Sequence, residues 1–254
     1  MIYRSDLKAD LPATLKHMGY PPGATPPAKV IDRLHALTET AKTILLPMVF
    51  YHTFPIQTPN VRGAVHFPET AEAFTSPFAA AALKGCREVI IAVATIKDKT
   101  EKQALDARST QRPASDQLIL KSIANAGLES LVEAFWDDMA AQSRCGAAEL
   151  SLRDRGLGGG TIGKSTGLTR IYLPGENAWP ITDQAILFRL LRAKEPALSV
   201  RLNDSLMMDP ENSLSFVIGK TLDGTFSEVH HDCGLCLLKG CQFRKETKSS
   251  DKTL

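Results

Sequence analysis

The spacing of apolar residues divides the first half of the chain into helices and one strong strand. Residues 1–20 and about 28–45 predict two helices, separated by the proline-rich segment PPGATPP. In the second segment the apolar residues recur every three to four positions, as on the buried face of a helix. Glu88–Ile96 (EVIIAVATI) is a nearly uninterrupted apolar and β-branched run. Such a run predicts a strand buried on both faces of a sheet.

The second half of the chain follows the same alternation around a glycine-rich connection. Helical spacing predicts a long helix over 116–144 and a shorter one over 181–193. Residues 199–208 and 213–220 predict two strands separated by the turn sequence DPEN. The charged residues 245–254 lack apolar anchors, and we expect them to form a disordered tail.

Composition and charge narrow the classes of partner. The 254 residues carry 30 Lys and Arg against 28 Asp and Glu, a formal net charge of +2, and the one basic stretch with an aromatic residue is KGCQFRKETK. Nucleic acid is therefore not an expected partner. No stretch approaches 18 apolar residues and the first residues do not form a signal peptide, so we expect no membrane span and a cytoplasmic protein.

Residues 158–165 (GGGTIGKS) match the phosphate-loop pattern GxxxxGK[ST]. That loop works between a buried strand and a helix whose N-terminus faces the phosphates. The preceding ELSLRDRGL is too charged for a buried strand, and Gly167 and Pro174 oppose a following helix. We interpret the segment as a flexible connection. An ATP-hydrolysing enzyme that uses Lys164 is kept as an alternative hypothesis.

Three of the five cysteines lie close together near the end of the chain. Cys233, Cys236 and Cys241 follow His230 and His231. A CxxC turn directs two thiolates at one metal, and a third cysteine with a histidine completes a zinc site or anchors an iron–sulfur cluster. The alternatives are reduced surface thiols and redox-active disulfide chemistry.

Segments along nearly the whole chain up to Arg244, in a fixed order, resemble a known family. They are RIYLPGENAWPITDQAILFRLL, VRLNDSLMMDPENSLSFVIGK, CGLCLLKGCQFR and, in the first half, the set LKHMGYPP, YHTFPI, GCREVIIAVATI and ANAGLESLVEAF. Together they resemble the activation (reactivation) domain of cobalamin-dependent methionine synthase, especially its stand-alone versions. The resemblance implies one α+β domain over residues 1–244, with a curved, largely antiparallel sheet and surrounding helices.

The resemblance also implies a ligand, site residues and partners. Family members bind S-adenosylmethionine and support reductive methylation of the Co(II) corrinoid, so the implied partners are a corrinoid-dependent methyltransferase or corrinoid protein and an electron-donor protein. The family's glutamate, arginine and glycine fall on Glu133, Arg170 and Gly175. A carboxylate suits the cationic groups of S-adenosylmethionine, and a guanidinium suits its carboxylate. An iron–sulfur cluster on the cysteines would suit electron delivery to cobalt.

Two departures from the family pattern affect the predicted ligand site. Arg170 lies five residues before Gly175, whereas the family has four, which implies one inserted residue. The family's tyrosine after that glycine is replaced by Glu176. An alternative hypothesis is therefore a corrinoid- or iron–sulfur-binding accessory protein that has no methyl-donor activity.

Overall fold

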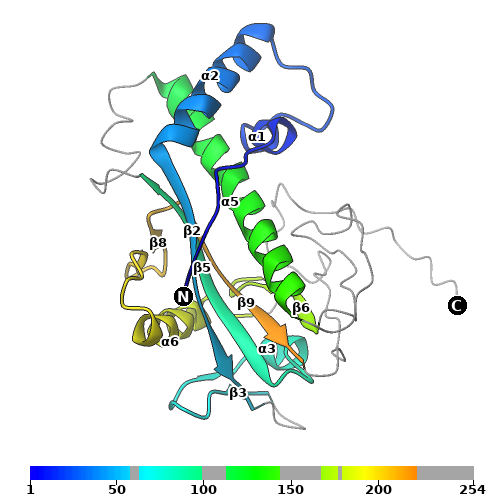
Figure 1. Cartoon of the computed structure of the whole chain (residues 1–254), viewed down its shortest axis with the longest axis vertical. Coiled ribbons are helices and arrows are strands. Elements are labelled where there is room, and N and C mark those ends of the chain that lie inside the picture. Colours follow the sequence, from blue (N-terminus) through cyan, green and yellow to red (C-terminus); the bar gives the residue numbers. More distant parts are fainter. Residues whose placement is uncertain (58–62, 99–112, 144–166, 177–178, 222–254) are drawn as a thin grey trace, which may run out of the picture.

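The computed structural model describes residues 1–57, 63–98, 113–143, 167–176 and 179–221. Its centre is an antiparallel sheet with the strand order β1-β2-β5-β9-β6. The long helix α5 lies along one face of the sheet, and α6 lies on the other side (Figure 1). This arrangement confirms the expected α+β class with a largely antiparallel sheet.

The main sheet consists of β1 (Ile2–Arg4), β2 (Leu45–Pro55), β5 (Glu88–Asp98), β9 (Ser213–Lys220) and β6 (Leu168–Tyr172). Two small hairpins pair β3 (Val65–His66) with β4 (Ala73–Phe74), and β7 (Arg201–Leu202) with β8 (Met208–Asp209). The helices are α1 (Leu11–His17), α2 (Ala28–Ile44), α3 (Pro77–Ala82), α5 (Ala114–Gln142), the 3₁₀ turn η2 (Ile181–Asp183) and α6 (Gln184–Lys194).

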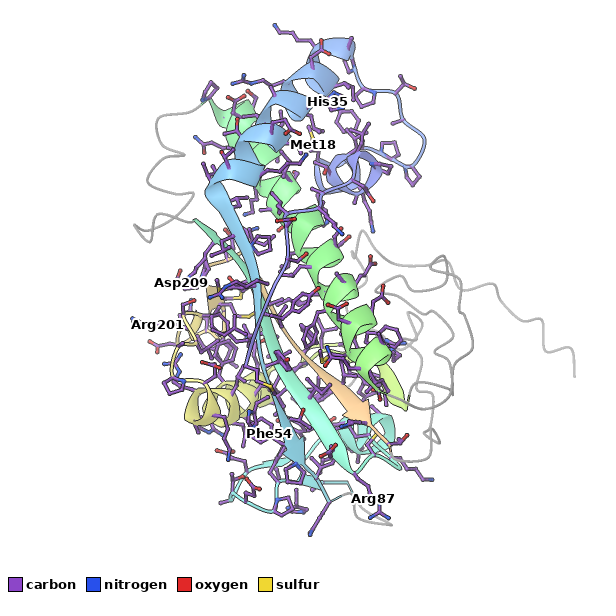
Figure 2. The ribbon with its side chains drawn as sticks, in the orientation of Figure 1. Met18, His35, Phe54, Arg87, Arg201 and Asp209 are labelled. Carbon is purple, nitrogen blue, oxygen red and sulfur yellow. The ribbon has the colours of Figure 1, made fainter. Side chains whose placement is uncertain are left out.

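The sheet separates two apolar cores. Side chains that alternate along β2, β5 and β9 point either toward α2 and α5 or toward α3 and α6. Phe135 of α5 is fully buried and packs edge-to-face on Tyr3, Tyr51 and Phe216, with ring centroids 5.0–5.9 Å apart. Figure 2 shows side chains on both sides of the sheet, from the end of the molecule near His35 to the end near Arg87.

Several predicted elements are confirmed. The apolar run at 88–96 forms the central strand β5, which pairs with β2 over its whole length and with β9. The helices expected over 28–45 and 116–144 are α2 and α5, and the strand expected over 213–220 is β9. The helix expected over 181–193 begins with the η2 turn and continues as α6.

Two expectations were wrong in part. Residues 1–20 are not one helix, because Ile2–Arg4 pairs with β2 and α1 begins only at Leu11. The Asp10 side chain caps that start by accepting from the Ala13 N–H at 2.6 Å. Residues 199–208 do not form a continuous strand, since only Arg201–Leu202 pairs there, with Met208–Asp209.

Candidate functional site

The edge strand β6 contains a β-bulge. Between Leu168 and Ile171 the register shifts, so three steps along β6 match two along β9. The Gly219 N–H donates to Thr169 Oγ1 at 2.8 Å, and the indole N–H of Trp136 donates to the Thr169 carbonyl at 3.0 Å. The bulge is therefore held by β9 on one side and by α5 on the other.

The bulge leads directly into Arg170, the arginine singled out from the sequence. Its guanidinium carbon lies 5.2 Å from the centre of the fully buried Tyr172 ring, a cation–π distance. Its Nη1 atom is buried and has no hydrogen-bond partner within the described chain. A buried guanidinium N–H without an acceptor is costly, so this atom is suited to an anionic group of a ligand.

A tight loop follows β6 and contains Gly175. The glycine has φ +94°, a conformation that L side chains rarely adopt, and its N–H donates to the Trp179 carbonyl at 2.9 Å. Trp179 is 1% exposed, packs near Phe74 and donates its indole N–H to the Asp183 carboxylate at 2.9 Å. Trp179 is therefore a core anchor that closes the loop.

Glu176 lies beside Gly175 and is half-buried. Its Oε2 atom has no hydrogen-bond partner among the described residues. Burial raises the pKa of Glu176 to about 6, against the opposing effects of the Arg170 charge and a backbone hydrogen bond at Leu173. Arg170 near the end of β6 and Gly175 and Glu176 in the turn that follows are therefore part of one segment, residues 170–176, called the β6 loop below, with a basic residue before the glycine and an acidic residue after it.

Replacing Glu176 by glutamine is expected to stabilise the protein without ligand at pH 8, by about 1–2 kcal/mol. The raised pKa means that the folded state prefers the protonated carboxyl, so wild-type stability falls as pH rises from 4.5 through about 6. The gain in the variant should therefore be present at pH 8 and nearly absent at pH 4.5. Urea unfolding at both pH values measures it.

The exposed Glu39→Gln on α2 is the matched control and should change the free energy of unfolding by no more than about 0.5 kcal/mol. A Glu176→Gln variant that is less stable than wild type at pH 8 would show that this carboxylate is satisfied in the folded protein. The assignment of Glu176 to a ligand site would then lose its support.

Glu133 lies on the exposed side of α5. Its pKa is raised first by desolvation and then by the negative charges of Glu129, Asp137 and Asp10. Arg170 is not among the charged groups that shift it. The structure thus places Glu133 in an acidic environment, on the same helix as the Trp136 that contacts β6, but pairs it with no basic group of the β6 loop.

Two predicted sites lie outside the described residues. They are the cysteine cluster of Cys233, Cys236 and Cys241 and the glycine-rich segment 158–165. Just after the latter, Leu168–Tyr172 forms a strand and not the helix that a phosphate loop requires. In the described ranges no group of three or more His, Cys, Asp or Glu could hold a metal ion, and no helix is long and apolar enough to cross a membrane.

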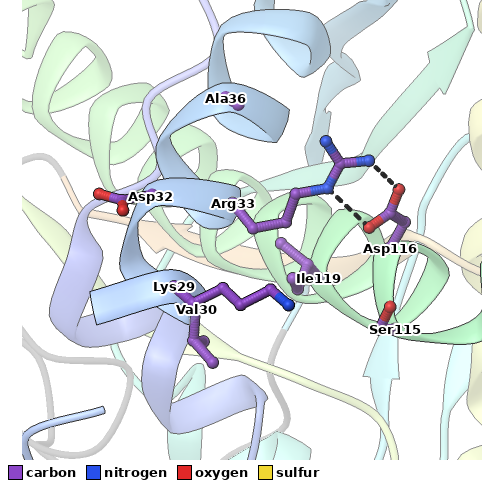
Figure 3. Close-up of a pocket in the computed structure, with 8 residues that line it drawn as sticks. All are labelled: Lys29, Val30, Asp32, Arg33, Ala36, Ser115, Asp116 and Ile119. Atoms are coloured by element: carbon purple, nitrogen blue, oxygen red, sulfur yellow. Dashed lines mark hydrogen bonds and ion pairs between the residues drawn. The ribbon is translucent and has the colours of Figure 1, made fainter. Parts of the chain in front are cut away.

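A surface pocket of about 510 Å³ lies between α2 and α5 (Figure 3). Its charged residues are Lys29, Asp32, Arg33 and Asp116, and the Arg33 Nε–H donates to the buried Asp116 carboxylate at 2.8 Å. Asp116 precedes Trp136 on α5 by about 30 Å of helix, at 1.5 Å per residue. The pocket is therefore remote from the β6 loop, and its acidic and basic side chains balance in charge.

Sequence reasoning missed the aromatic support of the site. Tyr172, which lies under the Arg170 guanidinium, also contacts Phe78 of α3 edge-to-face at 6.0 Å. The alternation of strand residues could have indicated this, since Arg170 and Tyr172 are two apart and face the same side. The bulge at Thr169 has no marker in the amino-acid pattern.

Comparison with known proteins bears on the fold. No protein-family model matches the sequence, and a search of curated proteins finds no significant match. Among solved structures 13 chains match significantly. One is the crystal structure of the MetH reactivation domain bound to AdoHcy, with 16% sequence identity and a TM-score of 0.57 over 89% of this chain and 79% of that one. The chain shares the fold of this reactivation domain.

Proposed function

We propose that the protein binds S-adenosylmethionine at the β6 loop and supports the reductive methylation of a Co(II) corrinoid carried by a corrinoid-dependent methyltransferase. The observation that carries the proposal is the buried, unpartnered Nη1 of Arg170 beside Gly175 and Glu176. The fold shared with a reactivation domain crystallised with AdoHcy supports it. An electron-donor protein would supply the electron that cobalt needs.

The residues of the loop have distinct tasks in this proposal. Arg170 binds the ligand carboxylate through charge-assisted hydrogen bonds, and the Tyr172 ring holds the guanidinium in place. Gly175 lets the loop take its turn, since its φ is +94° and a Cβ there would lie 3.0 Å from Ile181 Cδ1. When bound, S-adenosylmethionine supplies a methyl group on a sulfonium, and the protein's contribution is to orient it toward the partner's corrinoid.

Arg170→Ala is expected to weaken S-adenosylmethionine binding by about 10- to 100-fold, because a charge-assisted pair contributes about 1.5–3 kcal/mol. The affinity of Arg170→Lys should lie between those of wild type and Arg170→Ala, since lysine keeps the charge but not the planar guanidinium. Isothermal titration calorimetry measures both. The exposed Arg201→Ala on β7 is the control and should bind like wild type. Wild-type protein that gives no binding at millimolar ligand would contradict the proposal.

The methylation step has its own readout. Free cob(II)alamin with a low-potential one-electron reductant and S-adenosylmethionine is followed by visible absorption, with and without protein. We expect wild-type protein to speed the formation of methylcobalamin and Arg170→Ala to do so far less. Binding of S-adenosylmethionine without any acceleration would remove the methylation role and leave the binding role.

A second candidate is an accessory protein for corrinoid or an iron–sulfur cluster that lacks methyl-donor activity. The replacement of the family's tyrosine by Glu176 and the CxxC spacing of Cys233 and Cys236 favour it. A protein purified without oxygen that shows cluster absorption but no S-adenosylmethionine binding would decide for this candidate. A colourless, metal-free protein would exclude its cluster version.

A further inference from the structure

The β6 loop contains two buried atoms of opposite charge, each without a hydrogen-bond partner in the described structure. They are Nη1 of Arg170 and Oε2 of Glu176. The two groups interact electrostatically, since the Arg170 charge lowers the pKa of Glu176 while burial raises it. Even so, the loop does not close them into a pair that satisfies both atoms. Each unsatisfied atom costs free energy that a ligand of complementary charge would recover.

The ligand that suits both atoms carries an anionic and a cationic group close together. A ligand with a carboxylate alone would place a second negative charge beside Glu176, and one with an ammonium alone would place a second positive charge beside Arg170. A zwitterion satisfies the two atoms at once and adds no net charge to the buried site. An α-amino acid group has this arrangement, with both charges on one carbon.

We propose that Glu176 binds the α-ammonium group of a ligand whose α-carboxylate lies on Arg170, so that the β6 loop selects the amino-acid end of its ligand. The inference rests on the proposed function, because it specifies which part of S-adenosylmethionine or S-adenosylhomocysteine this loop recognises. It gives Glu176 the role that sequence reasoning assigned to Glu133. It also gives the replacement of the family's tyrosine a chemical consequence.

The surroundings of the two glutamates favour Glu176. Among the described residues, Arg170 is the one charged group that acts on the Glu176 carboxylate. Glu133, in contrast, is exposed and is surrounded by the carboxylates of Glu129, Asp137 and Asp10. A half-buried carboxylate next to a guanidinium binds an ammonium in a defined geometry, whereas an exposed acidic face attracts any cation.

The test is calorimetric titration with three ligands against three forms of the protein. The ligands are S-adenosylhomocysteine, its analogue with hydrogen in place of the α-ammonium group, and methylthioadenosine, which lacks the amino-acid end. The proteins are wild type, Glu176→Gln and Glu133→Gln. We expect wild type and Glu133→Gln to prefer S-adenosylhomocysteine over the deaminated analogue by about tenfold or more. Glu176→Gln should bind the two with nearly equal affinity.

The outcomes separate this inference from the proposed function. If Glu176→Gln keeps the full preference for the α-ammonium group, or if Glu133→Gln loses it, the role of Glu176 is overturned while S-adenosylhomocysteine binding stands. If wild type binds none of the ligands, the proposed function fails and this inference fails with it. Methylthioadenosine binding as tightly as S-adenosylhomocysteine would also overturn the inference, because the amino-acid end would then contribute nothing.

Discussion

Phe135→Ala is expected to lower the free energy of unfolding by about 3–5 kcal/mol. The side chain is fully buried between α5 and the sheet. Its ring meets those of Tyr3, Tyr51 and Phe216 edge-to-face, so truncation removes contacts with β1, β2 and β9 together. The cavity that remains is surrounded by a long helix and a wide sheet, which can close it only in part. Urea unfolding followed by circular dichroism measures the loss.

Two variants on the same helix give the comparison. Phe135→Leu keeps much of the volume and should cost about 1–1.5 kcal/mol. Leu118 is 51% exposed, and Leu118→Ala should change stability by no more than about 0.5 kcal/mol. A loss below about 1 kcal/mol for Phe135→Ala would contradict the packing of α5 on the sheet.

Trp179→Ala is expected to lower the free energy of unfolding by a similar 3–5 kcal/mol, and also to weaken the proposed binding of S-adenosylmethionine. The indole is 1% exposed and lies 5.3 Å from Phe74 between ring centroids. Its N–H donates to Asp183, and its carbonyl accepts from the Gly175 N–H. Truncation therefore opens a core cavity at the residue whose backbone carbonyl anchors the Gly175 turn, and leaves the Asp183 carboxylate without its donor. Thermal unfolding and calorimetric titration of the same preparation measure the two effects.

Trp179→Phe separates the hydrogen bond from the packing. Burial raises the pKa of Asp183 and the Trp179 N–H opposes that shift, so without the indole the pKa rises further. The free energy of unfolding of this variant should be about 1–3 kcal/mol lower than that of wild type at pH 8. That loss should shrink as the pH falls and Asp183 takes up a proton, because the neutral carboxyl no longer needs the donor. A loss that is equal at pH 8 and pH 4 would show that the hydrogen bond contributes nothing.

The strongest apolar patterns predicted their elements correctly, and interrupted patterns did not. β5 is buried on both faces, and its β-branched residues show this directly. β2 escaped prediction because Pro47 interrupts its apolar run. In the structure β1 pairs only with residues 48–50 of β2. Pro47 comes just before that stretch, so no β1 residue lies opposite its missing N–H.

The residues of the candidate site were chosen from the sequence, but their burial and electrostatics could not be predicted from it. Arg170 and Gly175 were taken from the family resemblance and Glu176 from a departure from it, and their closeness in sequence places them on β6 and the turn that follows it. Burial of single atoms depends on how Tyr172, Trp179 and the bulge at Thr169 pack, which only the folded chain shows. The assignment of Glu133 came from the resemblance alone, and our proposal gives its role to Glu176.

The most direct test of the account is the crystal structure of the protein grown with S-adenosylhomocysteine. We expect the ligand at the end of β6, with its carboxylate within hydrogen-bond distance of the Arg170 guanidinium and its ammonium beside the Glu176 carboxylate. Ligand bound elsewhere, for example in the pocket of Lys29 and Asp116 between α2 and α5, would contradict it. So would an Arg170 that makes no contact with a ligand bound at saturating concentration.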